Sequence, residues 1–338
     1  MFPKKFSNFA LRHISHAAAL ACGTLITACG GSSGSPEPDT SQSTQLLSTA
    51  SASSANSSQT GVDTASSMDT IYSTTEAVVA ATSSTIGASS TVTNTVVSCP
   101  GGGTATLTIT GGTAATQLNG RFDTGERYMV TYAKCIGAYG YAQLNGSIEL
   151  DITSVAGSTT SGTSAANIKA TNLSLTPAPG SAVVGSTVFN GNGTVSRSVS
   201  TAPNGSVTTV SHVIVPNATL NNSYGTRNGS FTLSDLDATR TVNSMSGTVT
   251  GSQYSGYHTL SGSARGLTFS LKISTNGNIS YDSAGVIATG QWTLVTANAT
   301  IVTKVANGTV VLTVDDSSNG TIDHTYTFPT ATLNASAS

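Results

Sequence analysis

The stretch Thr-Ala-Thr-Leu-Thr-Ile-Thr at residues 104–110 alternates threonine with small or aliphatic side chains. Successive side chains of a strand point to opposite faces, so Ala105, Leu107 and Ile109 would share one face and the threonines the other. This alternation predicts a strand with one face in a core and the other in water. The same pattern recurs in three further runs: SIELDIT (147–153), TFSLKIS (268–274) and TVVLTV (309–314).

Asn-Gly pairs occur between or beside the alternating runs. They include the pairs at Asn119, Asn145, Asn190, Asn204, Asn228, Asn276, Asn307 and Asn319. Asn-Gly favours tight hairpin turns, and where a pair lies too close to a strand its glycine indicates a bulge instead. Short connections favour antiparallel pairing, because parallel strands need crossovers of a dozen or more residues. We therefore expect residues 92–338 to form one all-β domain, a large antiparallel meander in a rolled, barrel-like sheet. A two-sheet β-sandwich is the alternative.

The composition limits the classes of partner. Only 8% of the 338 residues are charged and the formal net charge is −2, whereas soluble domains carry about 25% charged residues. Nucleic acid is not expected as a partner, since phosphate binding needs a concentrated basic face. Serine, threonine, asparagine and glycine take the place of charge, a bias common in secreted and surface β-proteins.

The first 28 residues have the organisation of a signal peptide. Lys4, Lys5 and Arg12 precede a mostly apolar segment, residues 14–28, that is too short for a transmembrane span of about 20 residues. The segment ends in Ile-Thr-Ala-Cys at positions 26–29, and glycine and serine follow. A compact residue before the cysteine suits a cleavage site.

This arrangement resembles the lipobox of bacterial lipoproteins. The resemblance implies that residues 1–28 are removed, that Cys29 carries a diacylglycerol thioether, and that a further acyl chain such as palmitate modifies the new amino terminus. Gly30 in place of aspartate implies the outer membrane of a Gram-negative cell. The lipid would be the only membrane contact, and two or more chains anchor stably. The alternative is an ordinary secretory signal with Cys29 as a free thiol.

Residues 29–91 read as a linker. They are rich in serine, threonine and glycine, which predicts a flexible, disordered tether that lifts the domain from the membrane. Within it we expect a short helix over 69–83, where Asp69 would cap a turn carrying Ile71, Val78 and Val79. The threonines in this segment lower its helix propensity.

Cys99 and Cys135 are predicted to form one disulfide. With Cys29 lipidated, they are the even pair left in an oxidising compartment. A bridge closing a loop of about 37 residues would stabilise the fold by roughly 3.8 kcal/mol in the chain-entropy model. Two buried free thiols are the alternative.

Residues 315–323, Asp-Asp-Ser-Ser-Asn-Gly-Thr-Ile-Asp, offer the best candidate site. Oxygen-bearing side chains stand at positions 1, 3, 5, 7 and 9 of a calcium-loop pattern, and glycine at position 6. These are Asp315, Ser317, Asn319, Thr321 and Asp323. The twelfth position holds Tyr326 instead of the bidentate glutamate. The pattern favours a hairpin turn between two strands, with Ca²⁺ binding by the same loop as an additional hypothesis; no other cofactor is expected.

Catalytic motifs are not found in the sequence. His212, His258 and His324 are far apart, and no nucleophile elbow, Walker or dinucleotide pattern follows the tether. His324 alternates with Ile322, Tyr326 and Phe328, which predicts an inward, hydrogen-bonded histidine.

We therefore expect a lipid-anchored protein with a non-catalytic binding or envelope-structural role; whether it binds a glycan, a protein or an apolar ligand is left open. Trp292, Tyr139 and Tyr141 are the aromatic candidates for stacking sugars, although core packing is their more common fate. Two rival functions remain. A periplasmic hydrolase would hold His212 or His258 in a cleft within hydrogen-bond reach of a serine or aspartate. A carrier of a small apolar ligand would have an apolar lumen.

Overall fold

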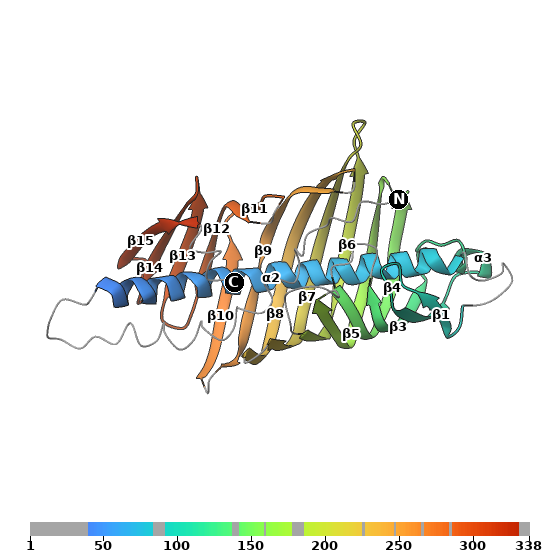
Figure 1. Cartoon of the computed structure of the whole chain (residues 1–338), viewed down its shortest axis with the longest axis horizontal. Coiled ribbons are helices and arrows are strands. Elements are labelled where there is room, and N and C mark those ends of the chain that lie inside the picture. Colours follow the sequence, from blue (N-terminus) through green and yellow to red (C-terminus); the bar gives the residue numbers. More distant parts are fainter. Residues whose placement is uncertain are drawn as a thin grey trace.

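Figure 1 shows the computed structural model of the chain, a single β-sheet with one long helix lying across one of its faces. The structure describes residues 40–83, 92–136, 142–158, 160–177, 186–224, 227–246, 248–264, 267–283 and 286–330. The predicted signal peptide and Cys29 lie outside these residues, and so do Tyr139 and Tyr141.

The sheet is an antiparallel meander of fifteen strands. They are β1 (Thr95–Ser98), β2 (Thr104–Thr110), β3 (Arg127–Ile136), β4 (Ala142–Gly157), β5 (Gly162–Pro177), β6 (Ser186–Thr201), β7 (Ser206–Tyr224), β8 (Arg227–Met245), β9 (Thr248–Ala264), β10 (Leu267–Thr275), β11 (Ile279–Tyr281), β12 (Ile287–Val295), β13 (Thr300–Ala306), β14 (Thr309–Asp315) and β15 (His324–Pro329). Each strand pairs with the next, except that β10 pairs with β12, while the short β11 pairs with β12 and β9.

The all-β class and the antiparallel meander are confirmed. All strands belong to one sheet, so the two-sheet sandwich does not apply, and in the described residues β1 and β15 end the sheet on opposite sides. The run at 104–110 forms β2 with Ala105, Leu107 and Ile109 buried, and the other three predicted runs lie in β4, β10 and β14. The period-two pattern thus correctly separated the inner face from the outer face.

The helix α2 (Thr40–Ser83) corrects the expected tether. Where a disordered linker over residues 29–91 with a short helix at 69–83 was expected, residues 40–83 form one 44-residue helix, about 66 Å long at 1.5 Å per residue. Its serine and threonine content weakens intrinsic helix formation, so packing must supply the stability. Met68, Ile71 and Val78 are almost fully buried in the same core as the inner face of the sheet.

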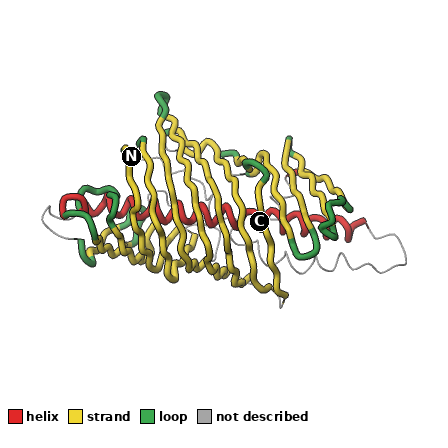
Figure 2. The backbone as a smooth tube through the Cα atoms, turned by 180° about the vertical axis from the view of Figure 1, so that it is seen from behind, coloured by secondary structure: helices red, strands yellow, loops and turns green. Residues whose placement is uncertain are grey.

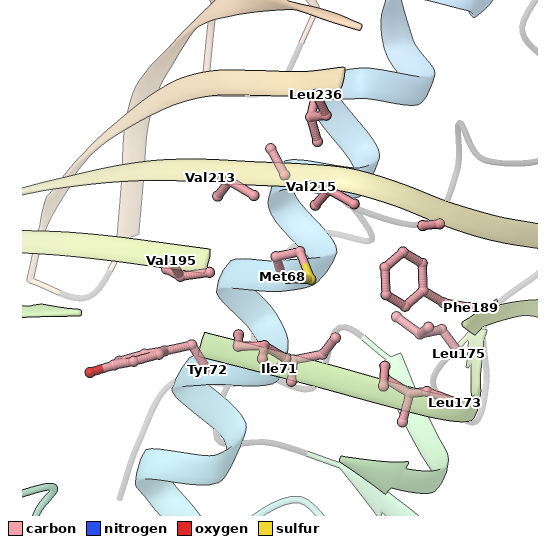
Figure 3. Close-up of a cluster of buried hydrophobic side chains, with 14 of the residues drawn as sticks. Met68, Ile71, Tyr72, Leu173, Leu175, Phe189, Val195, Val213, Val215 and Leu236 are labelled. Carbon is pink, nitrogen blue, oxygen red and sulfur yellow. The ribbon is translucent and has the colours of Figure 1, made fainter. Parts of the chain in front are cut away.

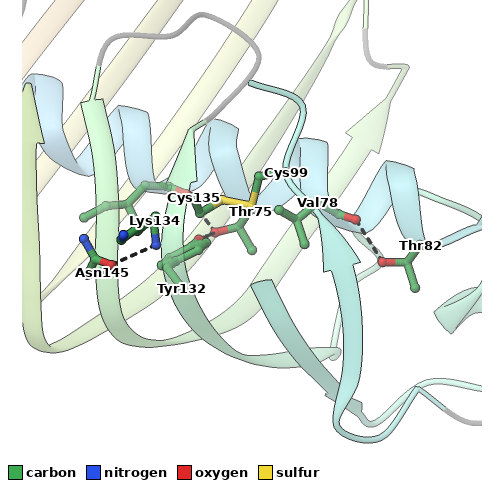
Figure 4. The surroundings of a disulfide bond; sticks show 9 residues. Thr75, Val78, Thr82, Cys99, Tyr132, Lys134, Cys135 and Asn145 are labelled. Atoms are coloured by element: carbon green, nitrogen blue, oxygen red, sulfur yellow. Dashed lines mark hydrogen bonds between the residues drawn. A yellow bond between two sulfur atoms is a disulfide. The ribbon is translucent and has the colours of Figure 1, made fainter. Parts of the chain in front are cut away.

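Side-chain hydroxyls explain how a threonine-rich helix can be buried. Thr64, Thr75 and Thr82 each donate a hydrogen bond from Oγ1 to the backbone carbonyl four residues earlier, at 2.7–2.8 Å. Figure 4 shows the bond from Thr82 to Val78. The bonded hydroxyl needs no water, which leaves the methyl group to pack against the sheet.

The helix runs along the inner face in the direction opposite to the strand order. Gly61 lies against β9, where an added Cβ would come within 2.5 Å of the His258 ring and 2.6 Å of the Tyr254 hydroxyl. Further along, the hydroxyls of Thr75 and Tyr132 of β3 form a 2.7 Å hydrogen bond. The helix is in front of the strands in Figure 1 and behind them in Figure 2, so it covers one face only.

The centre of the core joins the helix to four adjacent strands. Figure 3 shows Met68 and Ile71 among aliphatic and aromatic side chains of β5 to β8. These are Leu173, Leu175, Phe189, Val195, Val213, Val215 and Leu236, each no more than 3% exposed. Burial of this apolar surface contributes about 25 cal/mol per Å², and it is the main source of free energy that stabilises a helix of low intrinsic propensity on the sheet.

A line of β-bulges bends the sheet around the helix. Register shifts occur at neighbouring positions of β3 to β8, and bulges bend strands and increase their twist. The Asn-Gly pairs at Asn145 and Asn190 lie here and not in turns. Asn145 accepts a hydrogen bond from the backbone N–H of Lys134 at 2.8 Å (Figure 4), and Asn190 accepts one from Asn172 at 2.6 Å. Lys134 and Asn172 have positive φ angles of 50° and 47°, so each amide satisfies the backbone of a bulged neighbour.

Other Asn-Gly pairs form turns as predicted. Asn307 and Gly308, with φ of 52° and 72°, join β13 to β14 in a two-residue hairpin. Asn204, Asn276 and Asn319 also lie in loops between strands.

Candidate functional site

A cluster of charged side chains lies between α2 and the inner face of the sheet. Asp69 Oδ2 is 3.3 Å from Arg240 Nη1 of β8, and its Oδ1 is 3.7 Å from Arg197 Nε of β6. Asp69 Oδ1 also accepts a 2.9 Å hydrogen bond from Ser211 of β7, and Glu76 pairs with Arg197 at 3.2 Å. Two acids and two arginines balance the charge of this inner cluster.

The inner cluster determines where the helix lies on the sheet. The side chains of Asp69, Arg197 and Arg240 are only 16–22% exposed, so a displaced helix would leave partly buried charges without partners. Arg197 also lies 5.9 Å above the ring of Tyr72. Burial raises the pKa of Tyr72 to about 12, against opposing contributions from a hydrogen bond with Ser164 and from Arg197.

The inner cluster was not predicted from the sequence, although the spacing of its charged residues is consistent with it. Arg197 and Arg240 stand in phase with the inward residues Val195 and Ala238, and Asp69 and Glu76 are seven residues apart on one helix face. The helix predicted over 69–83 contains both acids, but nothing in the sequence indicates that it lies on the strands that carry the arginines.

On the opposite face, adjacent strands bring an aromatic ring, a carboxylate and an imidazole together. Ile214 of β7, Asp237 of β8 and Tyr257 of β9 are direct cross-strand neighbours, and His212 Nε2 lies 2.8 Å from Asp237 Oδ1. All four are solvent-accessible: the side chains of His212 and Asp237 are 42% and 39% exposed, and Tyr257 is 51% exposed. We call these four residues the outer patch.

The outer patch bears on the hydrolase hypothesis. His212 does lie within hydrogen-bond reach of an aspartate, and Ser196 and Thr239 are its cross-strand neighbours. The pair lies on the open outer face of the sheet, however, and not in the cleft that the hydrolase hypothesis requires. His258 is 2% exposed and faces the helix at Gly61.

The loop at 315–323 forms the predicted hairpin between β14 and β15. Asp315 accepts hydrogen bonds from the backbone N–H of Ser317 and Asn319 on Oδ1 and of Gly320 on Oδ2, at 2.7–3.2 Å. Although burial opposes the shift, these N–H groups lower the pKa of Asp315 below 3.8. Asp323 accepts from Asp316 N at 2.8 Å, and Thr321 donates its N–H to Asn319 Oδ1. These bonds account for the loop without a metal, and Ca²⁺ binding there stays a prediction.

His324 differs from its predicted orientation. Its side chain is 51% exposed on the edge strand β15, where it contacts Asp316 at 3.1 Å and stacks on Tyr326. The alternation with Ile322 failed because Ile322 precedes the strand and is itself 60% exposed.

The two cysteines predicted to pair do so. Cys99 and Cys135 form a disulfide with a Cα–Cα distance of 5.5 Å, within the usual range, and join the loop after β1 to the end of β3 (Figure 4). Trp292 is fully buried, so its ring packs in the core and does not offer a face on which a sugar could stack.

The described residues contain neither a metal-binding group of the usual side chains nor a membrane-spanning helix. No three histidine, cysteine, aspartate or glutamate side chains come together in them as a metal-binding group, and none of the described helices has an apolar stretch of the length that crossing a membrane requires. The sequence matches no family model, and comparisons with curated proteins and with solved structures find no similar protein.

Proposed function

We propose that the chain is a bacterial outer-membrane lipoprotein with a non-catalytic role, anchored through Cys29, and that the outer face of its sheet binds an envelope polysaccharide. The outer patch is the observation that carries the binding part of this proposal. The anchor rests on the lipobox resemblance at residues 26–29.

The difference in polarity between the two faces of the sheet supports a binding role for the outer face. The inner, apolar face packs against α2 in one hydrophobic core, so its aliphatic side chains serve folding. The outer face is polar and continuous: one cross-strand row runs from Thr110 of β2 through Asp237 and Tyr257 to Thr325 of β15. Such a surface suits an extended polymer better than a compact ligand.

The chemistry of the outer patch fits a polyhydroxylated chain. An exposed tyrosine combines an apolar ring face, which can stack on the C–H face of a sugar, with a polar hydroxyl. Asp237 accepts hydrogen bonds from sugar hydroxyls, and His212 can donate or accept. With His212 held by Asp237, the polar groups are positioned before a ligand arrives, which lowers the entropic cost of binding.

Binding is tested by co-sedimentation with insoluble peptidoglycan, and in a second arm with lipopolysaccharide vesicles. We expect Tyr257→Ala and Asp237→Asn to weaken retention at least tenfold in one arm. Met129→Ala is the matched control, since Met129 is 44% exposed on the outer face of β3, four strands from the nearest strand of the outer patch, β7. Equal retention of all four proteins in both arms would contradict glycan binding by the outer patch.

The anchor is tested separately. Labelled palmitate should enter the wild-type protein but not Cys29→Ser, and the variant should leave the membrane fraction. Hydrolysis of peptidoglycan that depends on His212 would instead favour the rival hydrolase.

A further inference from the structure

The connection between β2 and β3, residues 111–126, contains two buried oxygen atoms that accept no hydrogen bond. Glu126 is 1% exposed, and its Oε1 has no hydrogen-bond partner; the same is true of Oε1 of Gln117. Gln117 ends the short helix α3 (Ala114–Gln117) and donates from Nε2 to the carbonyl of Gly111 at 2.6 Å. The amide of Gln117 therefore lies beside Gly111, and Oε1 of Glu126 lies beside the next residue, Gly112.

The two oxygens of the Glu126 carboxyl differ sharply. Oε2 accepts hydrogen bonds from the backbone N–H of Asp123 at 3.3 Å and from the Tyr128 hydroxyl. Oε1 accepts none, although leaving a buried carboxylate oxygen unpaired is costly. Among the described residues no ion pair involves Glu126. The nearby Asp123 accepts a hydrogen bond from Asn119, and the cation that pairs with it is Arg121 at 3.8 Å, whose side chain is 64% exposed. The local charge is therefore negative and poorly compensated.

Glycine keeps the space beside Oε1 open. Gly111 and Gly112 have φ angles of 77° and 65°, in the left-handed region that glycine adopts without strain. A Cβ on Gly112 would lie 2.6 Å from both Glu126 Oε1 and Thr116 Oγ1. Any other residue there would occupy the position next to the unpaired carboxylate oxygen.

We propose that Oε1 of Glu126 and Oε1 of Gln117 bind a hard divalent cation, Ca²⁺ by preference. Calcium takes carboxylate and amide carbonyl oxygens in irregular geometry and completes its shell with water. A cation would neutralise Glu126 and bind α3 to the start of β3. This site is distinct from the 315–323 loop, because α3 lies at the β1 end of the sheet and β14 and β15 form the opposite end (Figure 1).

Terbium luminescence tests the proposal, since Tb³⁺ replaces Ca²⁺ at oxygen sites and is sensitised by a neighbouring tyrosine, here Tyr128. The purified protein, stripped with EDTA, is titrated with Tb³⁺, and its melting temperature is measured with and without Ca²⁺. We expect Glu126→Gln to weaken Tb³⁺ binding at least tenfold and to remove the Ca²⁺-dependent rise in melting temperature. Asp315→Asn, which alters only the other loop, should retain both.

Gln117→Glu distinguishes a bound cation from a bridging water, and it guards against a fold defect in Glu126→Gln. A second carboxylate should tighten Tb³⁺ binding at least threefold and lower the melting temperature only when Ca²⁺ is absent. The proposal is overturned if no sensitised luminescence appears at millimolar Tb³⁺, if the signal is lost in Asp315→Asn but kept in Glu126→Gln, or if Ca²⁺ does not restore the stability of Gln117→Glu.

Discussion

Asp69→Asn tests the packing of the long helix on the sheet. The change removes the charge that faces Arg240 at 3.3 Å and Arg197 at 3.7 Å, while the asparagine can still accept the hydrogen bond from Ser211. Removing one partner of a fully buried ion pair costs about 3–5 kcal/mol, and an exposed pair contributes about 0–1 kcal/mol. These side chains are 16–22% exposed, so we expect a loss of about 2 kcal/mol in the free energy of unfolding.

Asp151→Asn is the matched control. Asp151 pairs with Arg127 at 3.2 Å on the outer face, where the two side chains are 45% and 51% exposed. Solvent screening limits that pair to less than about 1 kcal/mol. Urea unfolding of both variants, with equal slopes, gives the comparison. If Asp69→Asn loses no more stability than Asp151→Asn, the helix does not lie on the sheet in the described register. A double-mutant cycle with Arg240→Met should then also give no coupling.

Four further predictions concern the helix, the disulfide and two ionisable groups. Gly61→Val should destabilise the protein by about 1–3 kcal/mol by overpacking against His258 and Tyr254, whereas Ala80→Val, at an exposed position of the same helix, should cost about 0.5 kcal/mol in thermal or urea unfolding. Cys99→Ser should lower the free energy of unfolding by about 4 kcal/mol, and reduction of the wild-type protein with dithiothreitol should have a similar effect. Unchanged stability after reduction would contradict the prediction. Burial raises the pKa of Tyr72 from 10.0 to about 12, so its contribution to the free energy of unfolding is complete below pH 10 and is lost as the pH rises to 12. Tyr72→Phe should reduce this loss of stability between pH 10 and 12 by about 3 kcal/mol. An unchanged pH dependence of stability in the variant would contradict the prediction. The pKa of Asp315 is shifted in the opposite direction, so its contribution to the free energy of unfolding is present above the unfolded pKa and is lost as the pH falls below it. A pKa of 3.8 or higher for the Asp315 carboxyl, measured by NMR titration, would contradict the assigned hydrogen bonds.

The strands were predictable because their signal is local. At β2 the inner and outer faces follow directly from the alternation of Ala105, Leu107 and Ile109 with threonine, and no distant residue is needed to read it. The disulfide was predictable by counting cysteines, since lipidation of Cys29 would leave Cys99 and Cys135 as one pair. Asn145 and Asn190 show where local reading ends: the same dipeptide that makes a turn at Asn307 stabilises a bulge when a neighbouring strand presents a free N–H.

The helix and the inner cluster were not predictable in full because their stability is tertiary. Residues 40–68 carry few strong helix formers, and the hydroxyls of Thr64 and Thr75 disfavour a helix until burial makes their bonds to the preceding turn worthwhile. Arg197 and Arg240 likewise have meaning only with Asp69 opposite them. The ion pairs of the inner cluster join residues more than 100 positions apart, and the helix packs on strands from β1 to β13; composition and periodicity do not reveal such contacts.

The correction of the tether changes the consequences of the proposed anchor. With a disordered segment of about sixty residues, the β-domain would have had no defined position relative to the membrane. Since α2 begins at Thr40, only eleven peptide units separate it from Cys29, and they span at most about 40 Å when fully extended. The helix begins at the β14–β15 end of the sheet and ends near α3 and β1 (Figures 1 and 2). A lipid on Cys29 would therefore keep the β15 edge near the bilayer. The β1 end could project by about the length of the helix, roughly 66 Å, and the outer patch, on β7 to β9, would lie between the two ends.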